Sequence, residues 1–256
     1  AGYTRASSVR SPMHRSLRFV IPSFSMLARV IVLGLVLGAS AATSVAAGLR
    51  ARVSIHVEAL DPGAQKLVEL YGTQNGPIHG RVFFKAGASR TEMPANAGPG
   101  FAGQVIVATA AGQVHQIAPA AEAYLTWPRR TPEKAPRIEA QRSGKTQTIA
   151  GYACEQVIFQ FGVETWEFWV TKDLPGLTAL DVSDNTLDAR RRAMYRQLGG
   201  VPIRSINTTA TYRLTSDLTE IEAQALEDAL FTIPAGYVQV KDAGDLMKRT
   251  SRAAPR

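Results

Sequence analysis

Cysteine and histidine are scarce in this 256-residue sequence, which contains one cysteine and four histidines. Because Cys154 is alone, no disulfide can form within the chain, and the fold must be held by its core. His56, His79 and His115 show no recognised metal-ligand spacing, so the sequence predicts no metal and no cofactor. A Gly-x-Ser-x-Gly motif is also missing. We therefore expect a protein that is not an enzyme.

A phosphate-binding loop is excluded as well. The segment Ser143-Gly144-Lys145-Thr146 resembles the end of such a loop, which needs a glycine five residues before its Gly-Lys pair. That position is Glu139. The segment also lies between two predicted strands, so we expect a hairpin turn there.

Acidic residues are absent from the first 47 positions, which hold five arginines and supply most of the net charge of +8. Without this segment, 24 of the 29 basic residues remain against 21 acidic ones. The remaining basic excess lies in residues 241–256, which we expect to be a disordered basic tail. A balance this even predicts no nucleic-acid partner.

The N-terminal segment has the three parts of a secretory signal. Read from Met26, a short positive region ends at Arg29 and the apolar run 30–37 follows. Small residues then continue through residue 47, and cleavage after Ala46 or Ala47 places small residues at the positions that signal peptidase requires. This predicts export to the periplasm.

An uncleaved membrane anchor is the alternative interpretation of this segment. Residues 30–47 provide only 18 positions, and their second half is weakly apolar, which is poor for a span of about 20 residues. We therefore expect residues 1–47 to be an N-terminal extension with a cleavable signal. Residues 48–240 then form one domain that keeps no membrane anchor.

Period-2 alternation of apolar residues, with short glycine-containing turns, dominates the sequence from residue 51 onward. It predicts strands over 51–60, 80–85, 88–93, 104–110, 113–118, 123–127, 137–142, 145–149, 154–161, 164–171, 201–209 and 211–223. One helix is predicted over 185–198, where it ends at Gly199-Gly200. Its arginines suit a solvated face, an anionic lipid surface, or a lid across the sheet.

The strongest hairpin joins 154–161 to 164–171 through Gly162-Val163, with glycine at the first central position as a type II′ turn requires. This register places Phe159 opposite Trp166 and Val157 opposite Phe168. Cys154 falls on the other face, where a packed, inert thiol is the simpler interpretation and a nucleophile paired with a histidine the alternative.

Apolar side chains on one side of these strands form the candidate binding surface. The candidate ligand-binding residues are Phe84, Val107, Val157, Phe159, Phe161, Trp166 and Phe168. Such residues usually fill the core of a sandwich or barrel. A strongly curved sheet would instead leave a concave cavity for an acyl chain or similar ligand.

Four segments carry a family resemblance: residues 150–155, 169–174, 198–204 and 228–237. In order and spacing the chain is similar, over roughly residues 80–240, to a bacterial exported family known as domain of unknown function 4412. The resemblance implies the fold of the periplasmic lipoprotein carriers of the LolA and LolB type. That fold is mainly β (α+β), a curved antiparallel sheet or unclosed barrel of about ten strands, with one or two covering helices.

The resemblance also bears on function. In the carriers the interior holds acyl chains, which favours a monomeric, non-enzymatic periplasmic protein that binds a lipid-like ligand. The carriers begin with a helix and this domain begins with a predicted strand, so a lipoprotein is a less suitable cargo than another apolar ligand. The alternative is a structural or interaction module of the cell envelope, with a self-filled core and a protein partner.

Overall fold

The computed structural model describes residues 47–85, 88–98, 101–109, 111, 113–127, 137–174 and 189–253. Within these ranges the protein is mainly β. The strands are β1 (Ala47–Ala59), β2 (Ile78–Lys85), β3 (Ala88–Glu92), β4 (Val105–Ala108), β5 (Val114–Ala118), β6 (Ala123–Trp127), β7 (Gln141–Ile149), β8 (Tyr152–Phe161), β9 (Glu164–Thr171), β10 (Val201–Thr208), β11 (Tyr212–Ala225) and β12 (Val238–Gln239). The helices are α2 (Gln65–Tyr71), α3 (Ala189–Leu198) and α4 (Ala243–Ala253), with 3-10 turns η1 (Pro62–Ala64), η2 (Pro119–Ala121) and η3 (Asp228–Phe231).

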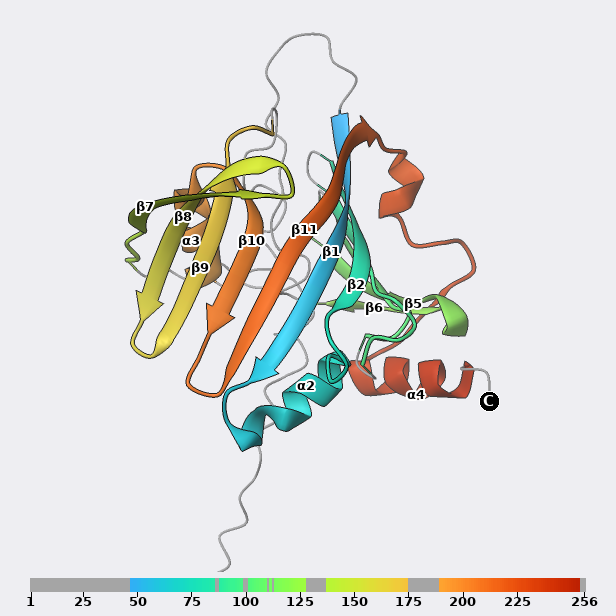
Figure 1. Ribbon diagram of the computed structural model, residues 1–256. Coiled ribbons are helices and arrows are strands. Elements are labelled where there is room, and N and C mark those ends of the chain that lie inside the picture. Colours follow the sequence, from blue (N-terminus) through green and yellow to red (C-terminus); the bar gives the residue numbers. More distant parts are fainter. Residues whose placement is uncertain are drawn as a thin grey trace, which may run out of the picture.

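All twelve strands of the described residues belong to one open sheet in the order β12-β6-β5-β4-β3-β2-β1-β11-β10-β9-β8-β7. Every pair is antiparallel except β12 with β6. The sheet curves strongly, so that β5 and β6 pass behind β1 and β2 in Figure 1. The expected fold class, a curved unclosed sheet with covering helices, is confirmed.

Alternation in the central strand β1 defines two faces of the sheet. Leu49, Ala51, Val53, Ile55 and Val57 are buried and lie on what we call the inner face; the opposite face is the outer face. The β1–β11 register places Val53 beside Leu218, and the β1–β2 register places Leu49 beside Phe84. The intervening arginines are exposed and pair with β11 carboxylates, as Arg52 does with Glu220 at 3.2 Å.

Strand β7 corrects two expectations. Segments 137–142 and 145–149 were expected to be separate strands joined by a turn at Ser143-Gly144, whereas β7 runs without interruption from Gln141 to Ile149. Its pairing with β8 is irregular between Arg142 and Thr146, and Gly144 there adopts a left-handed φ of 73°. The segment that resembles a phosphate loop is therefore a bulge in an edge strand.

The helices differ from expectation at both ends of the domain. Helix α2 was not expected, and residues 243–253 form α4 where we expected a disordered tail. The buried Leu246 fixes α4 to the sheet beside Leu125 and Val240. Residues 189–198 of the expected helix 185–198 form α3. None of the helices in the described ranges is long and apolar enough to span a bilayer.

Three expectations concern residues outside those that the structure describes. They are the signal segment through Ala46, positions 185–188 of the expected helix, and the last residues of the expected tail, 254–256.

Candidate functional site

The β8–β9 hairpin carries an aromatic cluster on the inner face of the sheet. Its register is the expected one, with Phe159 opposite Trp166 and Val157 opposite Phe168, and Gly162 has a positive φ of 60°. The ring centroids of Phe159 and Phe168 lie 6.0 Å apart, and those of Trp166 and Phe168 lie 5.9 Å apart. Edge and offset contacts of this kind add to the burial of the rings themselves.

Helix α3 covers this cluster. Met194, Tyr195 and Leu198 pack on the hairpin, and the Tyr195 ring lies 5.4 Å from that of Phe168. In Figure 1 the helix lies behind β8, β9 and β10. Five of the seven expected ligand-binding residues belong to this cluster: Val157, Phe159, Phe161, Trp166 and Phe168. The expected cover of the hairpin by the arginine-rich helix is therefore observed over 189–198.

The other two expected residues lie elsewhere. Phe84 is on the inner face, but it packs in a separate cluster with β1 and Leu49. Val107 is on the outer face beneath Phe231, so its placement with the others was wrong. The β3–β4 register pairs Thr91 with Ile106, which turns Ile106 inward and Val107 outward. An irregular connection between the two strands set this register, and period-2 alternation cannot be carried through such a connection.

A carboxylate at the start of β9 holds the N-terminal end of α3. Arg190 reaches Glu164 at 3.1 Å and lies over the Phe161 ring at 4.7 Å. Glu164 also accepts hydrogen bonds from Trp166 Nε1 at 2.7 Å and Asn207 Nδ2 at 3.1 Å. We call this group the Glu164 latch. It joins α3, β9 and β10 at one end of the aromatic cluster.

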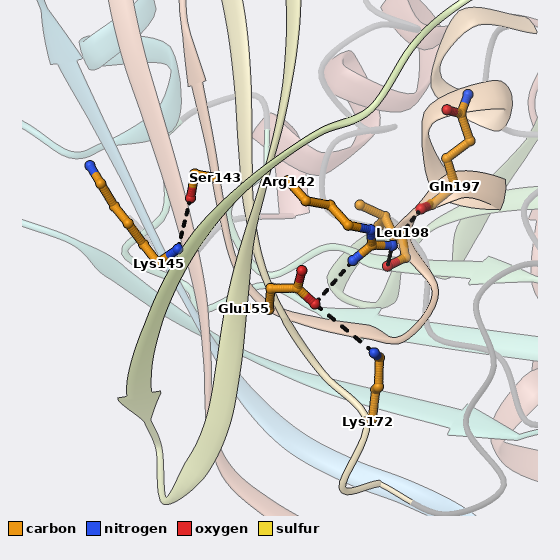
Figure 2. A network of polar contacts seen from close by, with 7 residues as sticks. All are labelled: Arg142, Ser143, Lys145, Glu155, Lys172, Gln197 and Leu198. Carbon is orange, nitrogen blue, oxygen red and sulfur yellow. Dashed lines mark hydrogen bonds and ion pairs between the residues drawn. The ribbon is translucent and has the colours of Figure 1, made fainter.

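A second set of polar contacts holds the other end of α3, as Figure 2 shows. Arg142 on β7 donates to the carbonyl oxygens of Gln197 (3.2 Å) and Leu198 (3.1 Å) and to the Glu155 carboxylate (3.1 Å). An arginine at these carbonyls satisfies acceptors that a helix leaves open at its C-terminus. Lys172 lies 4.0 Å from the same carboxylate. We call this group the Arg142 latch.

The Gln197 side chain strengthens this attachment. Its amide nitrogen donates to the Ile138 carbonyl at 3.0 Å, and its oxygen accepts from the Ala140 N–H at 3.2 Å. Sequence reasoning missed both latches. Each is a contact between residues far apart in sequence, and no local pattern joins Arg142 to the end of α3.

Beyond the Arg142 latch the inner face continues into a groove of about 390 Å³. Thr146, Glu155 and Lys172 give this groove a polar wall, and Val170 and Ala153 give it an apolar one. A groove of mixed character at the edge of an apolar face suits the polar end of an amphipathic molecule.

Residues 71–237 match the domain of unknown function DUF4412. The chain belongs to the DUF4412 family. The resemblance seen in the sequence is thus confirmed, although no curated protein matches the chain.

Two solved structures show remote similarity to the chain. The structure of PNGF-II in space group C2 aligns with 81% of this chain and 33% of its own, at 13% identity and a TM-score of 0.44. The lipoprotein LppX of Mycobacterium tuberculosis aligns with 67% of this chain and 85% of its own, at 8% identity and a TM-score of 0.30. The DUF4412 chain thus spans about a third of the length of PNGF-II.

The segments that identify the DUF4412 chain have structural roles. Ala150 and Gly151 turn the chain from β7 into β8 with positive φ angles of 50° and 85°. Gly199 ends α3 with a φ of 69°. A Cβ on Gly200 would lie 2.4 Å from the Thr171 carbonyl oxygen, so only glycine fits between α3 and β9.

The single thiol of the DUF4412 chain is packed away. Cys154 is 1% exposed, and its Sγ lies 3.5 Å from the Tyr152 carbonyl oxygen. Burial raises the pKa of this thiol above its ordinary value, and a thiol of raised pKa forms little thiolate at neutral pH. The expectation of a packed thiol is confirmed.

Two buried phenols, Tyr71 and Tyr195, and the partly buried Tyr212 lie near α3. Burial raises the pKa of Tyr71, Tyr195 and Tyr212, so all three stay protonated at neutral pH. Tyr212 donates to Asn207 Oδ1 at 3.2 Å, which connects it to the Glu164 latch. Within the described residues no three His, Cys, Asp or Glu side chains gather in a metal-binding arrangement.

Proposed function

We propose that the protein is a periplasmic, non-enzymatic binding protein that holds an apolar, lipid-like ligand on the inner face of β8 and β9. One observation carries the proposal: a single ten-residue helix, attached by polar latches at its two ends, covers an aromatic cluster on a curved, open sheet. In this function α3 is a lid. The ligand enters between α3 and the hairpin, and its polar end lies in the groove beyond Arg142.

The free energies of burial allow a ligand to replace α3 over the aromatic cluster. Met194, Tyr195 and Leu198 contribute most of the apolar cover, and burying one such side chain stabilises by about 1.5–3 kcal/mol. A buried methylene of a ligand contributes about 0.8 kcal/mol. An acyl chain of roughly six to eleven methylenes therefore offsets the loss of these three contacts.

The Glu164 latch is weak enough to open. The Arg190–Glu164 pair is partly exposed, at 38% and 22% of the two side chains. Exposed ion pairs contribute about 0–1 kcal/mol. Opening α3 at this end therefore costs little beyond the apolar contacts.

Ligand binding is tested by organic extraction of the purified protein and mass spectrometry, together with titration of a fluorescent fatty-acid analogue. We expect a co-purified lipid and saturable binding. Arg190→Ala should speed association of the analogue by removing the latch. Arg213→Ala is the matched control, because it breaks the Arg213–Glu58 pair of similar length (3.0 Å) between β11 and β1. Equal rates in both variants, or no lipid and no saturable binding, would refute the proposal.

A structural or interaction module is the second candidate function. It is favoured by the complete burial of Val157, Phe159 and Phe168, each 0% exposed beneath α3. A cluster already filled by its own helix needs no ligand. In that case Phe159→Asp unfolds the domain, whereas in a binding protein the same variant folds and loses uptake of the analogue.

A further inference from the structure

A groove of about 760 Å³ lies between α4 and η2, on the opposite side of the domain from α3 in Figure 1. Three cations line it, Lys248, Arg249 and Arg252, against the two carboxylates Glu122 and Asp245. We call it the α4 groove. Its chemistry differs from that of the inner face, because it is polar and carries an excess of positive charge.

The cations of the α4 groove have no partners among the residues that the structure describes. Among the described residues Lys248, Arg249 and Arg252 make no ion pair or side-chain hydrogen bond. Elsewhere on the sheet arginines are paired, as Arg50 is with Glu222 and Arg204 with Asp217. Charges on a folded surface that lack partners in the molecule are available to an external anion.

The helix dipole explains only part of this arrangement. Cations in the last turns of α4 and Asp245 in its first turn are the distribution that stabilises a helix. The dipole sets the position of charge along the helix axis. It does not require three cations to gather beside η2 around one groove.

The α4 groove is built on a fixed support. Leu246 is 1% exposed beneath the helix, and the N–H of Asp245 donates to the Asp242 carboxylate at 2.8 Å. The opposite wall is held as well, since the Val238 N–H donates to the Glu122 carbonyl oxygen at 2.9 Å. The cations are therefore presented by a rigid frame.

An exposed apolar side chain lies near the Glu122 wall of the groove. Val238 is 50% exposed and lies at the sheet edge, next to Glu122. Val238 precedes Val240 by two residues, and Val240 packs with Leu246 of α4. Because side chains alternate along a strand, the Val238 side chain lies on the same side of the sheet as α4. Cations and an exposed apolar side chain on the same side of the domain suit the interface of a bilayer, where headgroups are anionic and the layer below is apolar.

We propose that the α4 groove binds the phosphate groups of anionic phospholipids and docks the protein on a membrane surface, with Val238 entering the interface. An anionic bilayer supplies a dense array of phosphates, which fits three neighbouring cations better than a single small anion does. This surface is separate from the proposed ligand face beneath α3.

The test is cosedimentation of the purified chain with vesicles of phosphatidylcholine, with and without phosphatidylglycerol, at low and high salt. We expect salt-sensitive binding to the anionic vesicles only. About 1 kcal/mol per basic residue near such a surface predicts that Lys248→Gln, Arg249→Gln and Arg252→Gln together weaken partitioning on the order of 100-fold. Val238→Asp should weaken it further.

The control removes the same charge elsewhere. Arg50→Gln, Arg52→Gln and Arg213→Gln lie on the central strands and should leave most of the binding intact. Equal losses in both triple variants would mean that net charge alone acts and would overturn the proposal. Binding of inorganic phosphate without binding to vesicles would overturn it as well. If the α4 triple variant fails to fold by circular dichroism, Arg249→Gln alone is compared with Arg213→Gln, and equal partitioning overturns the proposal.

Discussion

The lid role of α3 predicts that the helix opens in a local event that leaves the sheet folded. Leu198 is 0% exposed and belongs to the cluster under α3, whereas Leu214 is 4% exposed and belongs to the separate cluster on β1 and β11. Leu198→Ala and Leu214→Ala remove the same atoms from these two places. Each should lower the free energy of global unfolding by about 2–5 kcal/mol, as measured by denaturant titration.

Hydrogen exchange of the α3 amides separates the two variants. If α3 opens locally, its amides exchange through that opening, and Leu198→Ala raises their rate roughly 30- to 5,000-fold, the equivalent of 2–5 kcal/mol. Leu214→Ala leaves the α3 rates unchanged, because the contacts of Leu214 persist in the open state. The reasoning is refuted if both variants accelerate the α3 amides equally, since α3 would then open only when the whole domain unfolds.

Two further predictions concern stability. Gly200→Ala should lower the free energy of unfolding, measured in thermal melts, by about 1–3 kcal/mol, because its Cβ would meet the Thr171 carbonyl oxygen at 2.4 Å. Gly244→Ala in α4 is the control. Its Cβ would meet only the movable Asp242 side chain, so this variant should be neutral or stabilising. Burial lowers the pKa of His115 below its ordinary value of 6.5, so the unfolded chain takes up this proton at a higher pH than the folded domain does. The free energy of unfolding should therefore decrease as the pH falls from 6.5 through the lowered pKa. His115→Gln should flatten this part of the pH–stability curve, and an unchanged curve would show that His115 does not cause it.

The sequence was sufficient to predict strand pairing where the two strands are neighbours in the chain. The β8–β9 hairpin follows from alternation in both strands and from Gly162, and each feature alone gives the observed register. The predicted strands 80–85 and 88–93 likewise pair as neighbours, with Arg81 opposite Glu92 and Val82 opposite Thr91. In both cases only two residues separate the paired strands, which limits the possible registers, so the face of every side chain follows.

The sequence was insufficient where contacts between residues far apart in the chain determine the position of a side chain or a helix. Val107 was assigned to the wrong face because its register depends on the irregular connection between β3 and β4. Helix α4 was missed although its apolar positions Ala243, Leu246 and Met247 follow a helical spacing, because the segment is short and Leu246 is its one buried residue. The latches of α3 were missed because Arg142 and Glu164 are far from their partners in the sequence and meet the helix only in the tertiary fold.

The central position of β1 has a consequence for the order of folding. The first described strand pairs with β2, which follows it closely, and with β11, which lies near the end of the chain. As the chain emerges, β1 therefore has one edge that stays open until almost the whole sequence has been delivered. Pairings of this sequence separation are slow to form. We therefore expect the β1–β11 pairing to form late in folding, after residues 212–225 have been delivered.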